Sequence, residues 1–248
     1  MAYSANPVSG AMYLVKGVSM IFNPSIRRFV LIPLGINIVF FAALSFFFFN
    51  LASDFVDSII NNIPGWLQWL ESIILVLVVM SLMIFVYFTF TLFANLFSAP
   101  FNGPLSTAVE LQYAGKTIDS GLSTMESFKL LGPILADEGQ KIFYSVTRSL
   151  PFLILFLIPG INIIATVGWF AMSAWILALQ YADYPLGNRN IRFRNQRKQL
   201  QEKRWLVIGF GSMVALMLMI PVVNFLVVPA AVAGATMMIH DHYELDMQ

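Results

Sequence analysis

The chain has 248 residues, of which 58% are hydrophobic, 15% aromatic and only 11% charged. Water-soluble domains carry about one quarter charged residues, so this composition excludes a soluble globular protein and indicates an integral membrane protein. The formal net charge of +1 provides no general field for a nucleic-acid partner, and the absence of cysteine excludes disulfides, iron–sulfur clusters and thiolate zinc sites.

Four uncharged blocks divide the chain, and the first two are expected to cross the membrane. Residues 29–53 follow an amphipathic N-terminal segment, 1–28, and contain just about the ~20 apolar residues that a helix needs to span the hydrocarbon. Residues 72–96 form the second predicted transmembrane helix. We expect a cytoplasmic helical segment over residues 97–148.

The third and fourth blocks, 149–182 and 205–239, are shorter than two crossings require, because two complete crossings need about 40 helical residues plus a turn. Both contain prolines at which we predict helix breaks. These breakers are Pro151, Pro159-Gly160, Pro221 and Pro229. The stretches LIPGIN (157–162) and MIPVVN (219–224) also share Ile-Pro with Asn three residues after the proline, which indicates related hairpins.

The basic residues indicate where these blocks enter and leave the membrane. The loop of residues 51–71 has no Lys or Arg, whereas the loop of residues 183–204 has seven. The positive-inside rule then places both flanks of the third block in the cytoplasm. The consistent solution is two re-entrant helical hairpins, 149–182 and 205–239, followed by a tail, 240–248. Proline-kinked spanning helices are the alternative.

The segment NPSIRRF (residues 23–29) stands directly before the first predicted span. Asparagine is a good helix N-cap and proline suits the first helical position, so the N–H groups of Ser25, Ile26 and Arg27 would point out of the helix start. Free N–H groups beside Arg27 and Arg28 would suit an oxyanion. An ordinary positive-inside anchor is the alternative.

Patterns for other chemistry are incomplete. AGKT (residues 114–117) lacks the first glycine of a phosphate-binding loop. His240 and His242 are two residues apart, so they do not share a helical face, and we interpret them as part of a solvated tail. We expect no enzyme activity, no metal site and no cofactor.

Five motifs resemble the CysZ family of bacterial sulfate permeases, and the resemblance extends over about residues 12–242. The motifs are IRRFVLIPL (26–34), APFNG (99–103), FLIPGI (156–161), SAWILALQYADYP (173–185) and MIPVVNFLVVPAAVAGAT (219–236). The resemblance implies a multi-pass protein of the bacterial cytoplasmic (inner) membrane that admits sulfate for cysteine biosynthesis. It also implies an all-α fold with two long transmembrane helices and two hemi-penetrating hairpins.

The resemblance also assigns candidate residues. The family's sulfate-binding run, Gly-hydrophobic-Arg-Arg, falls on Ser25, Ile26, Arg27 and Arg28, with serine in place of glycine. The charged positions that look similar to pore or network residues of the family are Glu110, Arg148, Asp183 and Asp241.

The partners that we expect are sulfate and related oxyanions such as sulfite, membrane lipid and further copies of the chain. We expect no nucleic-acid partner. The alternative function is a non-transporting, membrane-shaping scaffold whose arginine pair binds anionic lipid.

Overall fold

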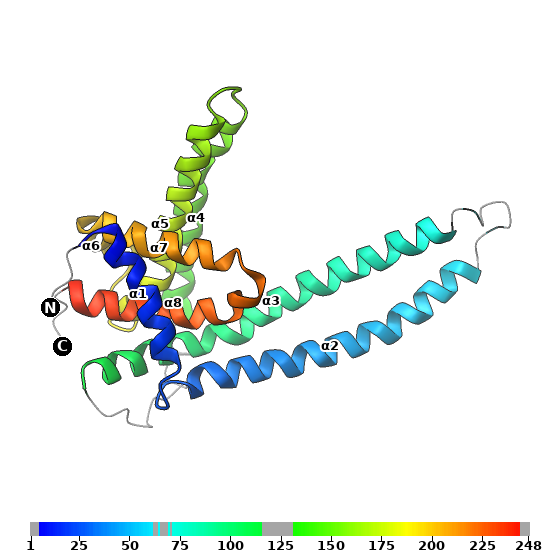
Figure 1. Ribbon diagram of the computed structural model, residues 1–248, viewed down its shortest axis with the longest axis horizontal. Helices are drawn as coiled ribbons and strands as arrows, with labels where there is room; N and C mark the ends of the chain where they lie inside the picture. The colour runs from blue at the N-terminus through cyan, green and yellow to red at the C-terminus, as the bar shows by residue number, and fades with distance from the viewer. Residues whose placement is uncertain (1–4, 62–63, 65–68, 70, 116–130, 244–248) are drawn as a thin grey trace. The chain divides into compact units, whose positions relative to one another are not determined.

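The computed structural model describes residues 5–61, 64, 69, 71–115 and 131–243, which are helical and contain no β-strand. In chain order the helices are α1 (Pro7–Ile21), α2 (Arg28–Asn61), α3 (Glu71–Tyr113), α4 (Leu131–Phe156), α5 (Asn162–Gly187), α6 (Phe193–Glu202), α7 (Arg204–Leu218) and α8 (Pro221–His242) (Figure 1). The prediction of an all-α protein is thus confirmed for the described residues. The chain forms two compact units: the packed unit, Met1–Val30 with Asn102–Gln248, and the two-helix unit, Leu31–Phe101.

The two-helix unit joins α2 and α3 through aromatic side chains. The ring centroids of Phe41 and Phe90 are 4.7 Å apart, and those of Phe48 and Phe85 are 5.3 Å apart. At ~1.5 Å per residue, α2 with 34 residues and α3 with 43 are both longer than a hydrocarbon core of ~30 Å. Many large apolar side chains of this unit are exposed, among them Phe46, which is 74% exposed. Such a surface suits lipid rather than water.

Within the described part of the chain, three helical stretches are long and apolar enough to cross a membrane: Arg28–Asn50 in α2, Asn162–Gly187, which is α5, and Phe225–His242 in α8. The first coincides with the predicted span 29–53. The second predicted span, 72–96, lies inside α3, where Leu75–Phe90 forms a shorter apolar helical stretch. These stretches make the chain an integral membrane protein.

In the packed unit, α1 lies against α7 and α8, and its backbone contacts theirs through glycine. A Cβ atom at Gly10 would lie 2.0 Å from the carbonyl oxygen of Leu206, and one at Gly17 would lie 2.0 Å from the carbonyl oxygen of Ala230. Tyr13, one turn after Gly10, is fully buried. Small residues let helices approach this closely, so α1 belongs to the core of this unit.

Two helix breaks fall where prolines predicted them, and two do not. Gly160 separates α4 from α5 with a φ of +87°, a conformation that glycine adopts without strain. Ile220 is extended before Pro221, which opens α8. The predicted breaks at Pro151 and Pro229 are wrong, because both prolines lie inside helices. A proline removes only one backbone hydrogen bond, so a helix can continue through it. Around Pro229 the flanking Val227 and Ala230 are also buried.

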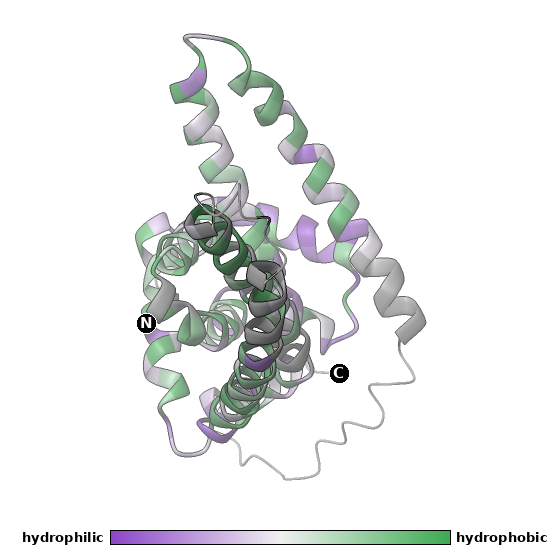
Figure 2. Ribbon diagram, turned by 90° about the vertical axis from the view of Figure 1, so that its right-hand side faces the viewer, coloured by the Kyte–Doolittle hydropathy of each residue, from purple (hydrophilic) through white to green (hydrophobic). Residues whose placement is uncertain are grey.

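The α4–α5 pair projects from the rest of the packed unit (Figure 1). Its tip carries exposed apolar side chains, including Leu157 and Ile163, which are 81% and 80% exposed. Figure 2 shows hydrophobic colouring on this tip. The described structure therefore contains two helix pairs with a break between their members, α4–α5 and α7–α8.

Candidate anion-binding site

The stretch before α2 is a tight turn whose donors are already engaged. The N–H groups of Ile26 and Arg27 both donate to the carbonyl oxygen of Asn23, at 2.9 Å in each case. The N–H group of Ser25 donates to Oδ1 of Asn23, at 3.1 Å. The expectation that these three N–H groups are free is therefore wrong in this structure. The helix begins only at Arg28, so the residues before it form a turn closed by asparagine instead of an open first helical turn.

This turn nevertheless presents both arginines to solvent. Ile26 is fully buried and fixes the turn to the core, whereas Ser25, Arg27 and Arg28 are exposed. The Arg28 guanidinium lies 4.9 Å from the ring centroid of Phe29. Neither arginine forms a salt bridge with a described residue. Two adjacent guanidinium groups on an anchored turn, without a neighbouring carboxylate in the described structure, attract an oxyanion.

Glu110 and Asp183 differ from this pair, because both are in ion pairs. Glu110 pairs with Arg189, which connects the end of α3 to the loop after α5. Asp183 of α5 lies 2.5 Å from Nζ of Lys141 on α4. The Nε2 group of Gln196, on α6, also donates to Asp183, at 2.8 Å. These carboxylates therefore brace helices of the packed unit.

Asp241 joins three helices at the end of α8. Its Oδ2 atom accepts hydrogen bonds from the hydroxyl groups of Tyr13 on α1, at 2.7 Å, and Tyr113 on α3, at 3.0 Å. His240 Nδ1 lies 3.6 Å from Oδ1 of the same carboxylate. The interpretation of this histidine-containing stretch as a solvated tail is wrong for residues 240–242, which end α8 and include this network.

Arg148 forms no salt bridge with a described carboxylate. Its guanidinium is 5.8 Å from the ring centroid of Tyr144, and Arg197 of α6 lies 4.9 Å from the same centroid. The hydroxyl oxygen of Tyr144 accepts a hydrogen bond from Nε1 of Trp175, at 3.0 Å. The four candidate network residues thus make different contacts: Glu110 with Arg189, Asp183 with Lys141 and Gln196, Asp241 with two tyrosines and His240, and Arg148 with Tyr144.

Sequence reasoning did not find the partners in these networks. Tyr13 is 228 residues from Asp241, and Arg189 is 79 residues from Glu110. Pairs this far apart leave no local periodicity that identifies them. Among the described residues, no group of three His, Asp or Glu side chains is placed to hold a metal ion.

The described fold defines the class of the protein as a helical integral membrane protein, and its turn before α2 carries two adjacent exposed arginines. The family model described as "Sulfate transporter CysZ/Etoposide-induced protein 2.4" matches residues 13–229, and the chain belongs to this family. The prediction made from the five motifs is confirmed. The family and relative names are those of transporters and not of enzymes.

Several curated relatives are similar over nearly the whole chain. The protein named Sulfate transporter CysZ from Pseudomonas paraeruginosa is 40% identical over 230 residues, which are 93% of this chain and 94% of the relative. The protein of the same name from Pectobacterium atrosepticum is 38% identical over 237 residues, 95% of this chain and 86% of the relative. These bacterial relatives and the apolar helices fit a protein of the bacterial inner membrane.

Proposed function

We propose that this chain conducts sulfate across the bacterial cytoplasmic membrane and supplies it for cysteine biosynthesis. The observation that carries the proposal is the pair Arg27 and Arg28, exposed on an anchored turn and without a salt bridge to a described residue. Its second support is that relatives about 40% identical are named sulfate transporters. Related oxyanions such as sulfite share the charge and tetrahedral or pyramidal oxygen geometry that this pair would recognise.

In the proposed site the two guanidinium groups hold the anion through charge-assisted hydrogen bonds. The Ser25 hydroxyl, on the same exposed turn, is a further donor within this stretch. The backbone N–H groups of Ser25 and Ile26 join the site only if the anion replaces Asn23 as their acceptor. A role for these N–H groups stays a prediction, and it requires the turn to open.

Both hairpins are proposed to enter the membrane part-way. In the α4–α5 pair, charge-free helix with exposed apolar side chains extends from Leu150 to Leu157 before the break and from Ile163 to Val167 after it, and Ile142, Phe143 and Val146 are exposed farther along α4, before Arg148. At ~1.5 Å per residue the two exposed stretches next to the break measure about 12 Å and about 8 Å, well short of a ~30 Å hydrocarbon core. The backbone at the break needs protein or water around it, since lipid offers no hydrogen bonds. A second copy of the chain would provide that cover, so we propose a homo-oligomer.

Flux measurement tests the proposal. Purified protein in liposomes should take up radiolabelled sulfate, and the variant with Arg27→Ala and Arg28→Ala should lose at least about tenfold in rate at low sulfate, because two charge-assisted contacts are removed. The control is Arg194→Ala, which removes an exposed arginine elsewhere in the packed unit. Equal loss in both variants would indicate a general charge effect, and unchanged flux in the double variant would exclude the site.

A further inference from the structure

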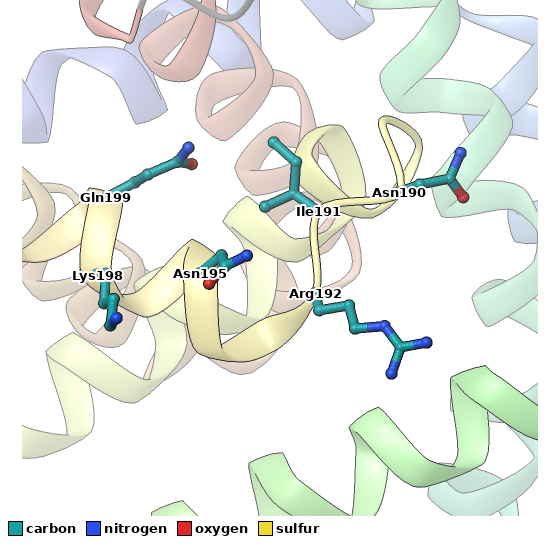
Figure 3. A pocket seen from close by; sticks show the side chains of 6 residues that line it. All are labelled: Asn190, Ile191, Arg192, Asn195, Lys198 and Gln199. Atoms are coloured by element: carbon teal, nitrogen blue, oxygen red, sulfur yellow. The ribbon is translucent and has the colours of Figure 1, made fainter.

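The loop between α5 and α6 and the first turns of α6 line an open hollow, the pocket, of about 420 Å³. The described residues that line it are Asn190, Ile191, Arg192, Asn195, Lys198 and Gln199 (Figure 3). They comprise two cations, three amides and one aliphatic side chain, with no carboxylate. In Figure 3, Arg192 extends from the start of this segment and Lys198 from its far end, with Asn195 between them along the chain. The described lining thus carries only positive charge.

Some of the basic side chains around this pocket already form an ion pair, a hydrogen bond or a cation–π contact, and others do not. Arg189 pairs with Glu110, and Lys203 donates to the carbonyl oxygen of His242. The guanidinium groups of Arg197 and Arg204 lie over the rings of Tyr144 and Trp205. These four cations each have a neighbour that accounts for their position.

Three cations remain without such a contact in the described structure: Arg192, Arg194 and Lys198. Two of them, Arg192 and Lys198, line the pocket. A positive-inside anchor requires cations near the membrane surface, but it does not require two of them to line one amide-rich hollow. Their position indicates a site for an anionic group.

The pocket wall is fixed and not a loose loop. The carbonyl oxygen of Ile191 accepts a hydrogen bond from Nε2 of Gln196, at 2.7 Å, and Gln196 is 2% exposed. The same Nε2 group donates to Asp183, which is paired with Lys141 of α4. A built wall of this kind holds polar groups in place for a ligand. It also connects the pocket to the base of the α4–α5 hairpin.

The size and the amides specify the ligand further. An open hollow of about 420 Å³ has room for more than one bare tetrahedral oxyanion. The exposed amides of Asn190 and Asn195 on the lining can both donate hydrogen bonds to a hydroxyl group and accept them from it.

We propose that this pocket binds a phosphate or sulfate group attached to a hydroxyl-bearing body, with Arg192 and Lys198 holding the oxyanion and the amides holding the body. The headgroup of an anionic phospholipid and a free polyol phosphate share this chemistry. The site is separate from Arg27 and Arg28, and it does not depend on sulfate transport.

Binding is measured by calorimetry on detergent-solubilised protein carrying Arg27→Ala and Arg28→Ala. These substitutions remove the proposed sulfate site, so that it does not contribute to the measured binding. One arm uses short-chain phosphatidylglycerol with phosphatidylcholine as its uncharged comparison, and the other uses glycerol phosphate. In each arm that binds, Arg192→Gln with Lys198→Gln should weaken binding at least about tenfold, and added salt should weaken it as well. Arg194→Gln, on the same helix but outside the pocket, should stay within about twofold.

Loss of phosphatidylglycerol binding in the double variant identifies a lipid headgroup, and loss of glycerol phosphate binding identifies a soluble ligand; either supports the pocket. The proposal is overturned if neither probe binds, or if the double variant binds as the parent does. Arg192→Lys with Lys198→Arg keeps both charges and should restore binding, which separates loss of the site from loss of the fold.

Discussion

The α4–α5 and α7–α8 hairpins have similar sequences at the break between their two helices, but different parts of the protein surround them. Around α7–α8, the backbones of neighbouring helices come into contact: a Cβ atom at Gly211 would lie 1.8 Å from the carbonyl oxygen of Ala174 on α5, and Gly17 of α1 is equally close to Ala230. The tip of α4–α5, by contrast, exposes Leu157 and its apolar neighbours. The shared Ile-Pro motif therefore determines where a helix pair breaks, while the glycines elsewhere determine whether that pair is enclosed.

The two hairpins also differ in how they are held. The glycine contacts of α7–α8 have no room for one additional carbon atom. The base of α4–α5 is held by the Lys141–Asp183 ion pair and by the Trp175–Tyr144 hydrogen bond. Polar contacts between side chains tolerate adjustment better than backbone contact does, so substitutions should affect the two hairpins unequally.

Cysteine labelling tests whether the α4–α5 hairpin crosses the membrane completely, and its outcome is all-or-none. The chain has no native cysteine to interfere. Leu157→Cys places a thiol at the exposed tip of α4–α5. If the hairpin enters the membrane part-way, a membrane-impermeant maleimide should label this thiol from neither side. Arg194→Cys, in the basic segment, should react from the cytoplasmic side only. Labelling of Leu157→Cys from outside the cell would mean that α4–α5 crosses completely.

Gly17→Ala should produce the largest loss of stability. The added Cβ atom would meet the carbonyl oxygen of Ala230 at 2.0 Å, and since backbone cannot turn aside, α1 must move away from α8. We expect a loss of about 3 kcal/mol, the upper end of overpacking effects. Thermal unfolding in detergent measures it. Gly35→Ala is the control, because nothing lies within 4 Å of its Cβ position. Equal melting temperatures for the two variants would refute close packing of α1.

Asp183→Asn tests the polar base of α4–α5. Loss of the carboxylate charge leaves Lys141 without this ion pair, and because both side chains are about one fifth exposed we expect a loss of only about 1 to 2 kcal/mol. A double-mutant cycle with Lys141→Met isolates the pair, and the coupling energy should be about 1 kcal/mol. Additive effects in the cycle would show that the pair contributes nothing to holding the hairpin.

Gly168→Ala should have the smallest effect, although its contact distance resembles that of Gly17. A Cβ atom at Gly168 would lie 2.3 Å from Cε1 of Phe152, the far edge of a ring that can rotate away. Alanine also favours the helix by about 1 kcal/mol over glycine. The net loss should be about 1 kcal/mol or less, and Phe152→Leu should remove it. A loss as large as that of Gly17→Ala would mean that the α4–α5 interface is as rigid as the α1–α8 interface.

Several features followed directly from the residues. Composition predicted a membrane protein, uncharged length located the first span, and Pro159-Gly160 and Pro221 predicted two of the helix breaks. The family membership was predicted from five short motifs that occur in a particular order along the chain. Each of these depends on local chemistry: apolar side chains avoid water, and proline and glycine change the backbone where they stand.

Tertiary structure alone decided the rest. Pro151 and Pro229 are chemically equal to the prolines that break helices, yet α4 and α8 continue through them. In the turn before α2, the N–H groups of Ser25, Ile26 and Arg27 donate to Asn23. The residues permit this closed turn and an open first helical turn equally. The partners of Glu110, Asp183 and Asp241 come from distant segments. The residue types therefore determined which groups could bind an anion, and the packing of the helices determined which cations were left available to do so.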